Sequence, residues 1–152
     1  MCTSFMGELM TATHNFGTAP TRGTSAADTF KGALYLASAT YNASTTAYST
    51  TGEVSGTNYT AGGVTVTNAT APTATNSSAT AGVAYWTPSA SLTYSNVTLS
   101  TAFDAVLIYN SSQSNKAVSV HTFGSQTITA GTFTLTMPTN NTTNALLRLA
   151  TT

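Results

Sequence analysis

The chain has 152 residues, of which 41% are hydrophobic and only 5% are charged, against roughly 25% charged in ordinary soluble domains. That length and hydrophobic content suit one domain with a packed core and exclude a disordered polar chain. Four basic and four acidic residues give zero net charge, which argues against a nucleic acid or an anionic membrane as partner, because both require a basic patch. So few charges leave a lone domain poorly soluble. We therefore expect copies of the chain or a larger assembly to cover much of its surface, and a surface kept soluble by Thr and Ser hydroxyls is the alternative.

We expect no targeting signal in the first residues of this sequence. Residues 1–9 lack the basic region and the continuous apolar core of a secretory signal, and no apolar run approaches the roughly 20 residues that span a bilayer. The single cysteine, Cys2, cannot form an internal disulfide, and so close to a terminus we expect it to be an unconstrained thiol. An intermolecular bridge through Cys2 is the less favoured alternative.

Residues 4–14 show the only helical pattern, with Ser4 as a suitable N-cap. Apolar side chains spaced four residues apart form one stripe along this segment. So short a helix is marginal alone and must dock, either on its own domain or on a neighbouring subunit. We therefore expect an N-terminal helical arm over residues 1–16. The candidate contacts with a capsid or with another copy are Phe5, Met6, Leu9 and Met10.

Residues 17–152 are expected to form the β-domain. Alternating residues predict a strand at 29–37, and residues 38–60 follow as a long polar arm with little periodicity. That arm is either an ordered surface loop or a contact segment. Three amphipathic rings punctuate it and are further candidate contacts, unless they only pin the arm to its own domain. They are Tyr41, Tyr48 and Tyr59.

The segments at 60–62, 80–82 and 129–131 each read Thr-Ala-Gly before a predicted strand. Glycine supplies the positive φ that tight turns need, so we expect a turn at each. A change of phase at residues 95–96 indicates a turn or a bulge. The alternating segments predict further short strands at 64–67, 83–86, 92–94, 97–99, 117–123, 132–137 and 147–149.

Residues 103–109 (Phe-Asp-Ala-Val-Leu-Ile-Tyr) contain an unbroken run of five apolar residues, bounded by turn-forming Ser, Thr and Asn. A short run of this kind is typical of a strand covered on both faces. We predict that it is the central strand. About seven or eight short strands separated by turn signals then predict an all-β single domain, an antiparallel β-sandwich or jelly-roll-like fold with a short N-terminal helix.

No group of residues assembles an active site. The candidate bases are His14 and His121, but in a chain so rich in hydroxyls a Ser or Thr near a histidine means little. Glu53 and Asp104 would have to meet for glycosidase chemistry, whereas we expect Glu53 to hydrogen-bond in its own turn. No Cys/His spacing fits a metal and no glycine motif fits a phosphate. We expect no enzyme, no metal and no cofactor.

Four segments share the pattern of a known family: residues 14–16 (His-Asn-Phe), 28–31 (Asp-Thr-Phe-Lys), 56–63 (Gly-Thr-Asn-Tyr-Thr-Ala-Gly-Gly) and 105–110 (Ala-Val-Leu-Ile-Tyr-Asn). Through them most of the chain resembles small β-rich virion structural proteins of tailed bacteriophages. The motifs are strands and turns. The resemblance therefore implies a structural component of the particle and supplies no catalytic residues.

The resemblance implies a capsid decoration or cement protein on the outer surface of the phage head. Such a protein would be made in the host cytoplasm without a signal peptide. It would bind the major capsid protein and itself, as a dimer or trimer, and stabilise the head lattice. We expect no nucleic acid and no membrane among its partners.

Two alternatives stay open. One is a tail, fibre or receptor-binding component that contacts a host surface glycan through Tyr85 and Trp86. The weaker one is a hydrolase acting on the host envelope through Glu53 or His121. The number of copies per particle separates a decoration protein from a tail component.

Overall fold

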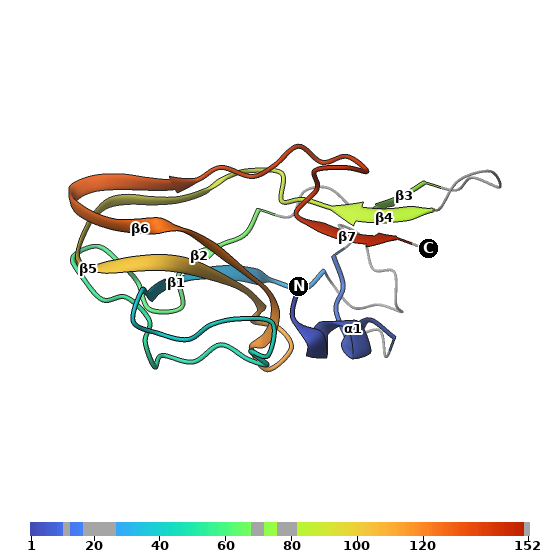
Figure 1. Ribbon diagram of the computed structural model, residues 1–152, viewed down its shortest axis with the longest axis horizontal. Coiled ribbons are helices and arrows are strands. Elements are labelled where there is room, and N and C mark those ends of the chain that lie inside the picture. Colours follow the sequence, from blue (N-terminus) through green and yellow to red (C-terminus); the bar gives the residue numbers. More distant parts are fainter. Residues whose placement is uncertain (11–12, 17–26, 68–71, 76–81, 151–152) are drawn as a thin grey trace.

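The computed structural model describes residues 1–10, 13–16, 27–67, 72–75 and 82–150. Within these residues the chain has one helix and seven strands. The strands form two antiparallel sheets, with strand orders β2-β1-β5-β6 and β3-β4-β7 (Figure 1). The predicted all-β, sandwich-like fold with one short N-terminal helix is confirmed. None of the helical segments described is long and apolar enough to cross a membrane. The elements are α1 (Thr3–Met10), β1 (Phe30–Leu36), β2 (Val64–Thr65), β3 (Thr73–Ala74), β4 (Val83–Trp86), β5 (Leu92–Asn110), β6 (Lys116–Leu135) and β7 (Leu147–Ala150).

Two long strands, β5 and β6, form one ribbon that bends back over itself (Figure 1). Its lower arm pairs residues 103–110 with 116–126, and its upper arm pairs residues 92–99 with 128–135. The sequence predicted several short strands here. The structure joins them, because each interruption is a shift of register inside a continuous ladder and not a turn. One shift lies between Tyr94 and Val97, where Asn96 has a φ of 53°, which confirms the predicted irregularity.

The predicted central strand is the lower arm of β5, which lies between β1 and β6. Residues 105–110 are buried throughout because both faces of the sheet are covered. On one face the upper arm packs, and the Tyr94 hydroxyl donates to the Gly32 carbonyl oxygen at 2.8 Å. On the other face the 38–60 arm packs, and the ring of Tyr48 stacks on Tyr109 with centroids 4.6 Å apart.

The 38–60 arm is an ordered loop that returns along β1. Val54 N donates to the Leu34 carbonyl oxygen at 3.0 Å, and Leu36 N donates to the Gly52 carbonyl oxygen at 2.9 Å. The same loop reaches the β5–β6 turn, where Tyr48 N donates to the Asn115 carbonyl oxygen at 2.9 Å. These bonds satisfy the backbone of a segment that has almost no strand of its own.

The N-terminal segment packs into the domain. Cys2 is fully buried and its N–H donates to the Val118 carbonyl oxygen of β6 at 2.9 Å. Burial raises the pKa of the Cys2 thiol, although the nearby terminal amino group opposes the shift. The expectation of an unconstrained thiol was wrong, because the first residues add to the edge of the sheet. The helix itself is shorter than predicted and ends at Met10.

The predicted turn at 60–62 is present, and its glycines, Gly62 and Gly63, both have positive φ. The segment 129–131 is different: it lies inside β6, and the positive φ of 45° falls on Ala130. The turn predicted there was wrong, because Thr-Ala-Gly forms an irregularity of the ladder at this place. Of the third segment, 80–82, the first two residues lie outside the described part of the chain.

Candidate interaction surface

A buried polar network ties the N-terminal segment to the end of the ribbon. His14 Nε2 lies 2.7 Å from Glu8 Oε2, and His14 Nδ1 lies 3.0 Å from Asn110 Nδ2. Asn110 Nδ2 also donates to Asp28 Oδ2 at 2.7 Å, so the amide faces His14 as a donor and leaves Nε2–H to bond Glu8. Lys116 Nζ donates to Glu8 Oε1 at 2.8 Å. The acid and base groups of the network therefore bond one another.

The two carboxylates of this network are held ionised. Burial alone would raise the pKa of Glu8, but hydrogen bonds from Lys116 and His14 outweigh it and lower that pKa. Burial likewise opposes the shift at Asp28, where donors from Gln113, Asn110 and the Asn15 backbone lower the pKa. Carboxylates that accept several hydrogen bonds inside a fold join segments together. This network therefore fastens Glu8, His14 and Asp28 to the ribbon.

A second network holds the 38–60 arm. Glu53 accepts hydrogen bonds from the Tyr48 hydroxyl at 2.7 Å, the Tyr59 hydroxyl at 2.8 Å and Gly62 N at 2.7 Å. We expected Glu53 to bond within its own turn; its partners instead lie five to nine residues away along the chain. Burial and the Glu53 carboxylate raise the pKa of Tyr109 to about 12. Glu53 is therefore the acceptor at the centre of a structural cluster.

The candidate tyrosines of this arm have hydroxyl partners within the chain. Tyr48 and Tyr59 donate to Glu53, and the Tyr41 hydroxyl donates to the Thr51 carbonyl oxygen at 2.8 Å. The Tyr41 ring also packs against Tyr35, with centroids 3.6 Å apart. All three candidates are half-buried and pin the arm to its own domain. Contact between these rings and a partner stays a prediction.

His121 lies on the face of β6 that is turned toward the upper arm. Its ladder partner Val106 pairs in turn with Leu34 of β1, on the same face of the sheet as Gly32, which the upper arm contacts. Its Nε2 is 2.9 Å from the hydroxyl of Ser119, which is fully buried. Burial, with a smaller effect of the terminal ammonium, lowers the pKa of His121 to about 4. His121 is therefore half-buried and neutral at neutral pH.

This shift predicts a pH dependence of stability. Because the pKa of His121 is near 6.5 in the unfolded chain and about 4 in the fold, the unfolded chain binds the proton more readily. The contribution of neutral His121 to the free energy of unfolding is complete above pH 6.5 and is lost as the pH falls toward 4. It amounts to roughly 2–3 kcal/mol. Urea unfolding at a series of pH values should show this slope in the native chain and not in His121→Asn. An unchanged slope in the variant would contradict the assignment.

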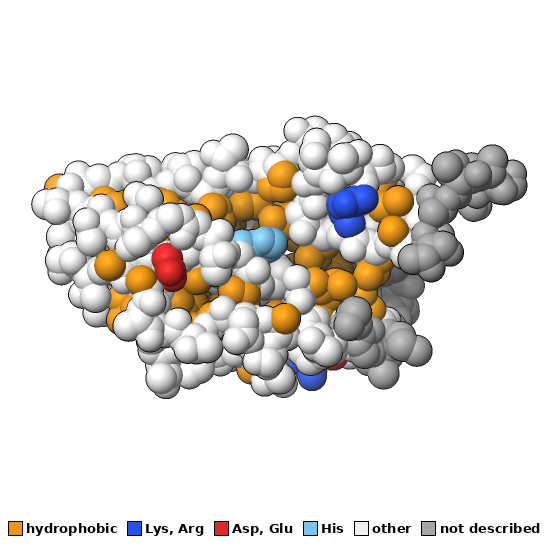
Figure 2. All heavy atoms as spheres, viewed as in Figure 1, with side chains coloured by type: hydrophobic (Ala, Val, Ile, Leu, Met, Phe, Trp, Pro, Cys, Tyr) orange, Lys and Arg blue, Asp and Glu red, His pale blue; other side chains and the backbone are white. Residues whose placement is uncertain are grey.

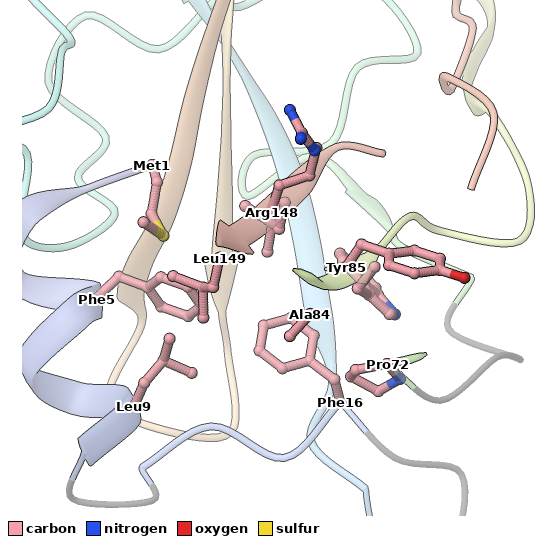
Figure 3. Close-up of a pocket in the computed structure, with 11 residues that line it drawn as sticks. Met1, Phe5, Leu9, Phe16, Pro72, Ala84, Tyr85, Arg148 and Leu149 are labelled. Atoms are coloured by element: carbon pink, nitrogen blue, oxygen red, sulfur yellow. The ribbon is translucent and has the colours of Figure 1, made fainter. Parts of the chain in front are cut away.

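A cleft opens at the end of the molecule where α1 faces β4 and β7 (Figure 3). It encloses about 80 Å³, and all the surface that lines it is apolar. Two large hydrophobic side chains of the described residues are well exposed, Met1 at 40% and Leu149 at 42%, and both lie on this cleft. The lining residues are Met1, Phe5, Leu9, Phe16, Pro72, Ala84, Tyr85, Trp86, Leu147, Arg148 and Leu149.

The cleft brings together candidate residues that belong to two separate hypotheses. Phe5 and Leu9 come from the helical stripe, and Tyr85 and Trp86 were the candidate glycan contacts. Trp86 is only 2% exposed and packs on Phe16 with centroids 4.8 Å apart, so its ring faces are taken up inside the domain. The side chains of the two remaining candidates, Met6 and Met10, lie outside what the structure describes.

Sequence reasoning missed the exposed rim of the cleft, Met1 and Leu149. Alternation along residues 147–149 predicted a strand, but alternation alone does not show that Leu149 stays uncovered while Leu147 is 8% exposed.

No group of three or more His, Cys, Asp or Glu that could hold a metal occurs among the described residues. Comparisons with protein-family models, with curated proteins and with solved structures found no match for this chain.

Proposed function

We propose that this chain is a structural protein of a tailed-bacteriophage virion, a capsid decoration protein that binds the major capsid protein and stabilises the head lattice. The observation that carries the proposal is the wholly apolar cleft with Met1 and Leu149 exposed at its rim. Exposed large apolar side chains gathered at one place mark a surface that binds another protein. The acid and base groups described above are meanwhile engaged in hydrogen bonds that hold loops in place.

The motifs that resemble the virion family support the same role. The first two, residues 14–16 and 28–31, meet in the buried network around His14 and Asp28. The third, residues 56–63, supplies Tyr59 and Gly62 to the Glu53 cluster. The fourth is the central strand. All four therefore contribute to holding one rigid domain together, as expected of a protein that fits a repeating lattice.

In this proposal the cleft receives an apolar side chain of the capsid protein. The two ends of the chain, Met1 and β7, lie beside each other at this cleft (Figures 1 and 3). The described residues that line the cleft include the cation Arg148 and no acidic side chain. Such a rim would favour a neutral or acidic capsid surface. Burial of the exposed apolar rim then contributes to binding at each lattice site, and symmetry multiplies the effect.

Location and copy number test the role. The chain would be quantified by mass spectrometry in particles purified from the phage that encodes it, and located in a density map of the intact particle. We expect a number of copies in fixed proportion to the capsid subunits and density across their boundaries. A small number set by the symmetry of the tail, with density at the tail or fibres, would favour the receptor-binding alternative. Absence from the particle would overturn both.

A rim variant tests the contact surface. We expect Leu149→Asp to reduce the affinity for heads by about tenfold or more, because an apolar contact of roughly 1.5–3 kcal/mol is replaced by a buried charge. Co-sedimentation with heads that lack the chain measures the loss. The matched control is Ala150→Asp, which adds the same charge one residue further along β7, outside the cleft lining. Equal loss in both variants would show that charge, and not the cleft, governs binding.

A further inference from the structure

We propose that the open edge of β6 is a self-association site, at which two copies of this chain pair their β6 strands antiparallel about a two-fold axis. The inference deepens the assembly role proposed above by naming the surface through which copies meet. It rests on an edge, a run of uncharged sequence and a row of half-buried apolar side chains, none of which belongs to the apolar cleft.

Among the described residues, the outer side of β6 has backbone hydrogen-bonding partners at its start. Ala117 N donates to the Thr46 carbonyl oxygen at 3.0 Å, and the Val118 carbonyl oxygen accepts from Cys2 N at 2.9 Å. Beyond these residues β6 is the last strand of its sheet and pairs only with β5 in the part of the chain that the structure describes. An edge of this length presents a row of backbone donors and acceptors to any strand that can lie beside it.

This edge lacks the chemical protection that isolated sheet edges carry. Natural edges are blocked by lysine, by inward-pointing charges or by proline. Between Lys116 and Arg148 the chain has no Asp, Glu, Lys or Arg, and its one proline there, Pro138, lies beyond the strand. The ladder shifts near Gln126 and Ile128 interrupt the edge, but regular pairing holds on either side of them, at 119–122 and 133–135.

The edge also borders an apolar seam. β6 is the last strand of its sheet, and it runs through both arms of the folded ribbon (Figure 1). On the face seen in Figure 2 hydrophobic side chains show through a hollow band, and charged side chains are sparse. The half-buried apolar residues that β6 contributes next to the core include Phe123, Ile128, Phe133 and Leu135.

A second copy is the occupant that this surface favours. An uncharged edge meets an identical edge without like-charge repulsion, and it offers nothing that would select a charged partner. A two-fold axis sets the two strands antiparallel, so that the donors of each edge face the acceptors of the other. The pairing would also cover both apolar seams, as the closed side of a sandwich does.

The test is the oligomeric state of the purified full chain, measured by sedimentation equilibrium in the absence of particles. We expect a dimer. Introducing charge on both arms of the edge with Thr122→Lys and Thr134→Lys, two exposed positions of β6, should raise the dissociation constant by roughly tenfold or more. The matched control places the same two charges on exposed positions of β5, Thr93→Lys and Thr101→Lys, and should remain dimeric.

Three results would overturn the proposal: a monomeric native chain, a β6 double variant that dimerises as the native chain does, or equal dissociation of the control. Amide hydrogen exchange of the native chain supplies a second measurement if the β6 variant fails to fold. Amides within 119–135 should exchange more slowly at high than at low protein concentration, and an unchanged rate would also overturn the proposal. Neither measurement involves heads, so its failure is distinct from failure of the proposed capsid role.

Discussion

Replacing Gly63 with alanine is expected to destabilise the fold by roughly 3–5 kcal/mol. Gly63 has a φ of 72°, which an alanine adopts only with strain. A Cβ at this position would stand 1.7 Å from the Gly32 carbonyl oxygen and 2.8 Å from the Ala33 Cα. These are backbone atoms of β1, so relief requires either the strand or the turn to move. Urea unfolding of the variant and the native chain at neutral pH measures the difference.

Gly124→Ala is the matched control. Gly124 lies on β6, has no positive φ, and a Cβ there would meet nothing within 4 Å. We expect its free energy of unfolding to stay within about 0.5 kcal/mol of the native value. If Gly63→Ala were as stable as Gly124→Ala, the turn at 60–63 would not be docked on β1 as described.

The parts of the fold that could be predicted from the sequence are those set by local chemistry. The run at 103–109 is largely apolar on both faces, and its shortness and β-branched residues favour a doubly covered strand over a buried helix. The pair Gly62-Gly63 follows Tyr-Thr-Ala, and both residues take the positive φ that such a turn demands. Each of these features depends on a few adjacent residues, so the sequence carries the information directly.

The bend of the ribbon could not be predicted in the same way. Interruptions near Asn96 and Ala130 looked like the ends of short strands, whereas the ladder continues through them. Whether a break in alternation ends a strand or only shifts its register depends on the partner strand, and thus on residues far away in sequence. The order of the 38–60 arm has the same origin, because Glu53 and its tyrosine donors show no periodicity.

The candidate site was predicted in part. The helical stripe pointed to Phe5 and Leu9, and both line the apolar cleft. Trp86 was predicted to contact a ligand because its ring is amphipathic, but it lies in the core. Residue type alone does not show which face of a short strand the rest of the domain covers. The open edge of β6 was missed for a related reason: a sequence shows that a strand exists, and only the topology shows which strand is last.

Replacing Glu53 with alanine is expected to cost roughly 3–5 kcal/mol. The variant leaves the hydroxyls of Tyr48 and Tyr59 and the Gly62 N–H without their acceptor, and Gly62 is buried. Unsatisfied buried donors cost about 1–3 kcal/mol each, and water reaching the half-buried tyrosines offsets part of the sum. Urea unfolding measures the loss. Limited proteolysis should show cleavage within 38–60, because the arm loses the group that holds it.

Glu53→Gln separates hydrogen bonding from charge. Its carbonyl oxygen can still accept from Tyr59 and Gly62, and its amide can donate to the Tyr48 hydroxyl, which accepts as readily as it donates. We therefore expect a smaller loss, about 1–2 kcal/mol, and an arm that stays resistant to proteolysis. If glutamine were as damaging as alanine, the negative charge itself would hold the arm. If neither variant lost stability, the arm would be held by its ring contacts, with Tyr48 stacked on Tyr109 and Tyr41 on Tyr35.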